Sequence, residues 1–235
     1  MNVLLTLLFA CGGKTDADDT AAEPATEPAI EPASEASGEP SGEPTTEPSG
    51  EPSGDPTGDL YPAPANLVGT WVGPCFPSPQ GDGSYNQLTF TFTETTWDLD
   101  YVANGDENCS YPFLTVNIAG DFTLEGASEV VEGAREGTFG FSTKTVTGHM
   151  AEALSVIENA CGVTDTVVDT PVDITGGCMG LGAYPVADCP ADYDIVLMNA
   201  EGTTLSFGAR PQDNNMCTPE NRPTSFEGGA TVTKQ

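Results

Sequence analysis

Polar and apolar residues alternate strictly over residues 87–93, where Leu88, Phe90 and Phe92 share one side of the chain and threonines occupy the other. A repeat of two is typical of a β-strand that buries one face. The same repeat resumes over residues 97–101 after a polar interruption. These two segments therefore predict a hairpin or bent ribbon with one aromatic face.

Short apolar segments of this kind recur after residue 60. They predict further strands, separated by turns rich in Gly, Asn and Asp, over residues 67–72, 113–118, 122–124, 130–131, 139–146, 193–198 and 203–207. One segment differs, because Met150, Ala153, Leu154 and Ile157 recur at helical spacing and Gly162 follows where a glycine commonly ends a helix. The sequence thus predicts a mainly β fold, an antiparallel barrel or half-barrel with one short helix over about 148–161.

The chain begins with an apolar run over residues 3–10, which is too short to span a bilayer because spanning takes about 20 residues. It fits the apolar region of a secretory signal peptide. The tetrapeptide Leu8-Phe9-Ala10-Cys11 resembles the bacterial lipobox, whose cysteine is acylated and becomes the mature N-terminus. Met1-Asn2 departs from that pattern because it lacks a basic residue. We expect a signal peptide over 1–10 and lipidation of Cys11; the alternative is a chance apolar N-terminus with a free cysteine.

This anchor predicts a bacterial lipoprotein of the outer membrane, either facing the periplasm or exposed at the surface. The outer membrane is favoured because Gly12, and not aspartate, follows the cysteine. The membrane is then a partner through the lipid anchor.

Residues 11–59 repeat Glu-Pro with a period of four, from Glu23-Pro24 to Asp55-Pro56, with small residues between the pairs. Such a segment has almost no apolar surface to bury, so nothing offsets the entropy of ordering it. Proline and like charges favour an extended spacer of about 3.1 Å per residue. We expect a disordered acidic linker, with a proline-motif ligand as the alternative, followed by one barrel-like domain over 60–235.

The chain has 36 acidic and 6 basic side chains among 235 residues, a net charge of −30. A field of this sign repels phosphate backbones, which argues against nucleic acid as a partner. The composition leaves the oligomeric state open.

Six cysteines follow Cys11, and an even number in an exported chain predicts disulfides. The pairing Cys75–Cys109 would tie the first strand to the end of the Trp97 ribbon, and the simplest pairing of the rest is Cys161–Cys178 with Cys189–Cys217. A zinc site is the alternative, but the chain has no CxxC spacing and one histidine. No metal and no other cofactor is therefore expected.

Other candidate chemistry is weak. His149 has no nucleophile motif beside it, and the carboxylates of Asp98 and Asp100 are expected by composition in so acidic a chain. Segments 80–84 and 104–108 offer oxygens suited to calcium but lack the spacing of an EF-hand loop, so they are interpreted as turns. Nothing in the sequence indicates an enzyme.

Several of these residues together resemble the adenomatosis polyposis coli down-regulated domain family. The resemblance covers about residues 67–162 and rests on Gly69-Thr70-Trp71, Cys75, Phe90, Trp97, Cys109, Pro112, Ile118, Gly120, Gly133-Ala134, Glu136, Val146-Thr147, Ala153-Leu154, Asn159 and Cys161-Gly162. Gly148 departs from it, because a proline often follows the threonine. The segment Arg222-Pro223-Thr224-Ser225 also looks like the end of bacterial members. The resemblance implies a barrel with an apolar pocket for a lipid chain. A Gly-x-Trp on the first strand is likewise found in lipocalins, although these usually lack the cysteine pattern.

We therefore expect a lipoprotein whose lipocalin-like barrel binds a lipid or another apolar small molecule. The candidate pocket residues are Trp71, Phe90, Phe92, Trp97, Tyr101 and Ile118. The alternative is a structural or protein-interaction lipoprotein whose barrel is filled by its own side chains, because core packing explains the same aromatic residues.

Overall fold

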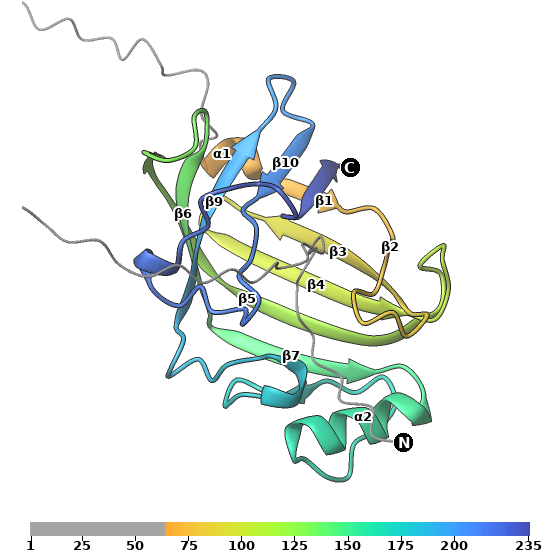
Figure 1. Ribbon diagram of the computed structural model, residues 1–235. Coiled ribbons are helices and arrows are strands. Elements are labelled where there is room, and N and C mark those ends of the chain that lie inside the picture. Colours follow the sequence, from red (N-terminus) through yellow and green to blue (C-terminus); the bar gives the residue numbers. More distant parts are fainter. Residues whose placement is uncertain (1–63) are drawn as a thin grey trace, which may run out of the picture. The chain divides into compact units, whose positions relative to one another are not determined.

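The computed structural model describes residues 64–235. The predicted signal peptide, Cys11 and the Glu-Pro linker lie outside the described residues. The domain after the linker forms a single sheet of eleven strands (Figure 1).

Eight of these strands close into an antiparallel barrel, one of the two architectures, barrel or half-barrel, that the sequence predicts. In ring order they are β1 (Gly69–Val72), β3 (Tyr85–Phe92), β4 (Thr96–Asn104), β5 (Pro112–Ala127), β6 (Arg135–Gly140), β9 (Ala191–Met198), β10 (Thr204–Phe207) and β11 (Thr231–Lys234). β11 then pairs with β1 and closes the ring.

The remaining elements lie around the barrel. The strands are β2 (Phe76–Pro77) beside β3, β7 (Thr143–Gly148) beside β5, and β8 (Val172–Asp173) beside β7. The helical elements are α1 (Pro64–Leu67), α2 (Ala151–Cys161), and the short 3₁₀ turns η1 (Met179–Leu181) and η2 (Pro219–Asn221). In Figure 1, α2 lies beyond β7, on the side away from β4. Between residues 64 and 235, the helices are too short or too polar for any of them to cross a membrane.

The aromatic ribbon predicted from the alternating residues is the β3–β4 hairpin. Its register places Phe90 opposite Leu99 and Phe92 opposite Trp97, and all four side chains are buried. The alternation in sequence therefore corresponds to the inward and outward faces of the barrel wall.

Four local predictions differ from the structure. Residues 113–124 belong to one continuous strand, β5, which passes through Gly120 without a turn. Residues 139–146 form two strands, because the chain turns at Phe141 and Ser142. Residues 130–131 lie in a loop, and α2 starts at Ala151, later than predicted, because β7 extends to Gly148. The C-terminal end of α2 is as expected, since Gly162 has a left-handed backbone and donates its N–H to the carbonyl of Glu158.

Aromatic side chains fill one end of the barrel. The Phe92 ring packs edge-on against Phe122, with centroids 5.2 Å apart, and Trp97 packs edge-on against Phe139 at 5.4 Å. Phe90 stacks on Phe207 at 4.5 Å, which joins β3 to β10 inside the barrel. Towards the other end, the interior is hollow.

Candidate functional site

The hollow part of the barrel is a cavity of about 700 Å³. This volume falls within the range of about 300 to 1,000 Å³ that small-molecule sites occupy. Its wall is largely apolar and comes from inward-facing residues of the β3–β4 ribbon, β5 and β6, among them Leu88, Phe90, Leu99, Val116, Ile118 and Phe139. An eight-stranded barrel has room either for its own side chains or for one small ligand, and here part of the interior is left unfilled.

The structure brings four of the six predicted pocket residues to the cavity wall. Phe90, Trp97, Tyr101 and Ile118 line it. Phe92 does not, because it packs into the aromatic end of the barrel against Phe122 and Phe139.

Trp71 also lies away from the cavity wall. Its side chain is completely buried, its indole N–H donates to the carbonyl oxygen of Leu67 at 2.7 Å, and Lys234 Nζ lies 5.1 Å from its ring centroid. Trp71 therefore joins α1, β1 and β11 within the core. It is a packing residue at the seam where the barrel closes, and it does not line the cavity.

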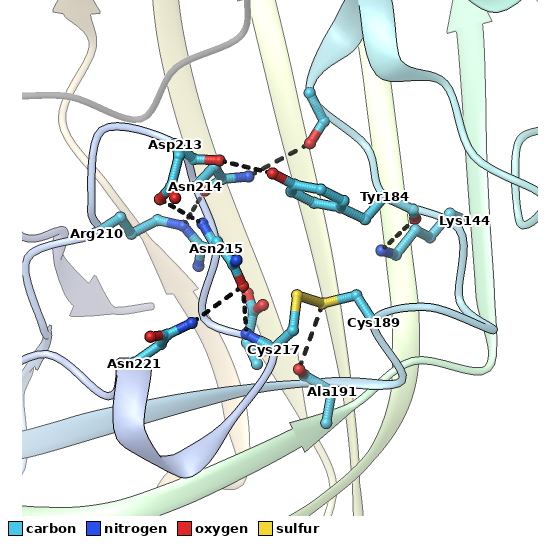
Figure 2. Close-up of a disulfide and its surroundings, with 12 residues drawn as sticks. Lys144, Tyr184, Cys189, Ala191, Arg210, Asp213, Asn214, Asn215, Cys217 and Asn221 are labelled. Atoms are coloured by element: carbon cyan, nitrogen blue, oxygen red, sulfur yellow. Dashed lines mark hydrogen bonds and ion pairs between the residues drawn. A yellow bond between two sulfur atoms is a disulfide. The ribbon is translucent and has the colours of Figure 1, made fainter.

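Three disulfides join the pairs that the sequence favours, and each fastens a segment that lines the cavity. Cys75–Cys109 lies beside the lining segment 76–79, and Cys161–Cys178 ties α2 to the segment that carries Leu181 and Tyr184. Cys189–Cys217 ties that same region to the loop that carries Arg210 and Asn214 (Figure 2). Disulfides thus fasten three of the segments that line the cavity outside the barrel strands.

Four charged residues line the cavity as well, and the sequence patterns did not mark them as site residues. They are Lys144 on β7, Asp192 and Asp194 on β9, and Arg210 in the loop after β10. Arg210 Nη2 donates to Asp192 Oδ2 at 2.5 Å, and its Nε donates to Asn214 Oδ1 at 2.5 Å. Figure 2 shows Lys144, Tyr184, Arg210 and Asn214 grouped around the Cys189–Cys217 disulfide.

Burial perturbs two of these groups. Desolvation raises the pKa of Asp194 to about 7, although Arg210 and the backbone N–H groups of Ile195 and Gly208 act in the opposite direction. Desolvation lowers the pKa of Lys144, opposed by the nearby carboxylate of Asp192. A cavity with an apolar wall and a few polar groups is the usual form of a small-molecule site.

The other candidate residues lie outside this cavity. His149 is held between Thr115, whose Oγ1 is 2.8 Å from Nε2, and Asp169, whose Oδ1 is 2.7 Å from Nδ1. The order of hydroxyl, imidazole and carboxylate in Thr115, His149 and Asp169 is that of a hydrolase triad. None of the three residues lines the cavity. These contacts join β5 to the loops on either side of α2.

The carboxylates of the predicted turns and of the Asp98–Asp100 pair form hydrogen bonds with nearby residues. The Nδ2 group of Asn117 bonds to the carboxylates of both Asp98 and Asp100. Asp82 accepts hydrogen bonds from Ser84, and Asp106 accepts them from Ser110 and Tyr111. Across residues 64–235, no three His, Cys, Asp or Glu side chains are grouped so as to hold a metal ion.

Neither models of protein families nor curated proteins match this chain.

Proposed function

We propose that this protein is a membrane-anchored lipoprotein whose barrel binds a lipid or another apolar small molecule in its cavity. The observation that carries the proposal is the cavity of about 700 Å³ between the β3–β4 ribbon and β9. Protein interiors normally pack without voids much larger than a water molecule. Occupation by a ligand would remove the apolar wall from water, which stabilises by roughly 25 cal/mol per Å².

The alternative, a structural or protein-interaction lipoprotein with a filled barrel, fits the aromatic end but not the hollow part. Phe92 and Phe122 account for the filled end without any ligand. The cavity next to Phe90 and Leu99 has no such filling. The three disulfides support the proposed ligand binding, because they fasten segments around the cavity.

The first test is native mass spectrometry of the full chain carrying Cys11→Ser, which removes the predicted acyl chains as competing ligands. We expect the protein either to carry co-purified lipid or to bind one added fatty acid per chain. A protein that stays bare at micromolar concentrations of fatty acid would refute ligand binding.

The two tryptophans allow the site to be located. Trp97 lines the cavity and Trp71 does not. In Trp71→Phe, a brominated fatty acid should quench the remaining Trp97 emission strongly. In the matched variant Trp97→Phe, the emission of Trp71 should change little. Equal quenching in the two variants would place the ligand outside the cavity.

The anchor has a separate test. The proposed lipidation of Cys11 predicts that the unsubstituted chain fractionates with membranes and that Cys11→Ser is released into the soluble fraction. Membrane association that survives the substitution contradicts the anchor and leaves the barrel proposal untouched.

A further inference from the structure

One side of the cavity wall carries charge, although the rest is apolar. Lys144 projects inward from β7 beside Ile118, its partner on β5, while Asp192, Asp194 and Arg210 line the same cavity. The charge that a ligand needs in order to bind depends on which of these side chains already have a partner of opposite charge within the protein.

The Arg210 guanidinium is balanced. It pairs with Asp192 at 2.5 Å, and Asn214 accepts a second hydrogen bond from it. Asp194 is also engaged, since its Oδ1 accepts the backbone N–H groups of Ile195 and Gly208.

Lys144 is different. The residue is 4% exposed, and Nζ donates to the carbonyl oxygen of Tyr184 at 3.1 Å (Figure 2). Nζ also lies 3.8 Å from the centroid of the Phe141 ring. Within the described domain, no ion pair joins Lys144 to a carboxylate. An ammonium group has three N–H donors and is costly to bury without a counter-charge.

We propose that the cavity takes an apolar molecule that carries a carboxylate, and that this carboxylate accepts hydrogen bonds from Lys144 Nζ. The inference rests on the proposed function and names the ligand class for the same cavity. The apolar part of the ligand lies along Phe90, Leu99 and Ile118, which line the same cavity.

The charge of the site selects a monoanion. Below pH 7, burial keeps Asp194 protonated because its pKa is about 7, and Arg210 is paired with Asp192, so Lys144 supplies one positive charge that a carboxylate neutralises. A phosphate dianion would bring a second negative charge close to Asp192, where like charges repel. A straight-chain fatty acid has the required chemistry.

The test compares a brominated fatty acid with the matching brominated primary alcohol. Both are titrated into the full chain carrying Cys11→Ser, with tryptophan quenching as the readout. A charge-assisted hydrogen bond predicts that the acid binds about tenfold to a hundredfold more tightly than the alcohol. This comparison needs no cavity variant, so it does not depend on how a Lys144 variant folds.

Lys144→Met keeps an unbranched side chain one atom shorter and removes its charge, and should make acid and alcohol bind alike. The matched control is Lys234→Met, which removes a lysine that also lies over an aromatic ring but does not line the cavity. It should leave the preference for the acid unchanged.

Equal affinity for acid and alcohol in the parent chain overturns the carboxylate inference and leaves the proposed function standing. A Lys144→Met variant that still prefers the acid also overturns it. Failure of both compounds to bind refutes the proposed function, and this inference with it.

Discussion

The indole N–H of Trp97 on β4 donates a 2.9 Å hydrogen bond to the carbonyl oxygen of Gly140, the last residue of β6. At this point β5 changes partner, pairing with β7 up to Ala119 and with β6 from Phe122 onwards. The bond therefore fixes the cavity wall at the place where the sheet divides.

Gly120 lets β5 pass close to the end of β6 where the pairing partner changes. A Cβ atom at that position would overlap the carbonyl oxygen of Gly140. We expect Gly120→Ala to lower the free energy of unfolding by about 2 to 4 kcal/mol, because the wall must shift to admit the methyl group. Urea denaturation of the full chain measures the change.

The matched control is Gly126→Ala in the same strand. No atom lies within 4 Å of the added Cβ there. Its stability should stay within about 0.5 kcal/mol of the parent. If the two substitutions cost the same, crowding at Gly140 is not the reason for glycine at position 120.

Asp194 makes stability depend on pH. Burial raises its pKa from an ordinary value of 3.8 to about 7, so between these values the folded chain keeps a proton that the unfolded chain releases. The free energy of unfolding should therefore fall as pH rises from about 4 to about 7, by on the order of 1.4 kcal/mol per unit at the steepest, and then level off.

Asp194→Asn isolates this effect, because the amide oxygen can still accept the N–H groups of Ile195 and Gly208. Urea unfolding of both chains between pH 4 and pH 8 should show the parent losing stability relative to the variant across that window. Parallel curves would mean that Asp194 does not titrate there.

The inward faces of β3 and β4 could be predicted because one face of each strand meets the core and the other meets water. Leu88, Phe90 and Phe92 therefore alternate with threonine. Closure of the ring was not predictable, because β11 has a single apolar residue, Val232, between polar neighbours. Its place is set by pairing with β1 and β10, distant in sequence.

The charged residues that line the cavity could not be predicted from the sequence, because the alternation of polar and apolar residues does not show which face they occupy. Lys144 would lie on the outer face if residues 139–146 formed one strand, but the turn at Phe141 and Ser142 reverses the order of the faces. Asp194 is followed by Ile195 and Val196, both fully buried on opposite faces of β9, so the strand shows no alternation.

The Cys189–Cys217 disulfide should matter for both stability and ligand preference. It joins residues 28 apart and holds the loop with Arg210 beside Tyr184. Replacing both cysteines by alanine should lower the free energy of unfolding by about 3 to 4 kcal/mol on the chain-entropy estimate. The preference for acid over alcohol should also shrink, because the carbonyl of Tyr184 accepts a hydrogen bond from Lys144 Nζ and the charge of Arg210 acts on Lys144.

Replacing Cys75 and Cys109 by alanine is the control, since this pair closes a similar loop of 34 residues on another part of the wall. We expect a comparable loss of stability with the acid preference retained. Loss of the preference in both double variants would indicate general loosening of the cavity.

Arg222 fastens the C-terminal segment to the outer face of the barrel. Its Nη1 donates to the carbonyl oxygens of Asp194 at 2.8 Å and Gly137 at 3.2 Å, while Nη2 lies 3.3 Å from a Glu125 carboxylate oxygen and 3.4 Å from one of Glu136. Arg222→Met leaves these acceptors without their donor, and should lower the free energy of unfolding by about 2 to 4 kcal/mol. Arg222→Lys keeps the charge but not the planar fork that reaches three strands at once, so it should recover less than half of the loss. Full recovery by lysine, measured by the same urea titration, would show that charge alone matters at this position.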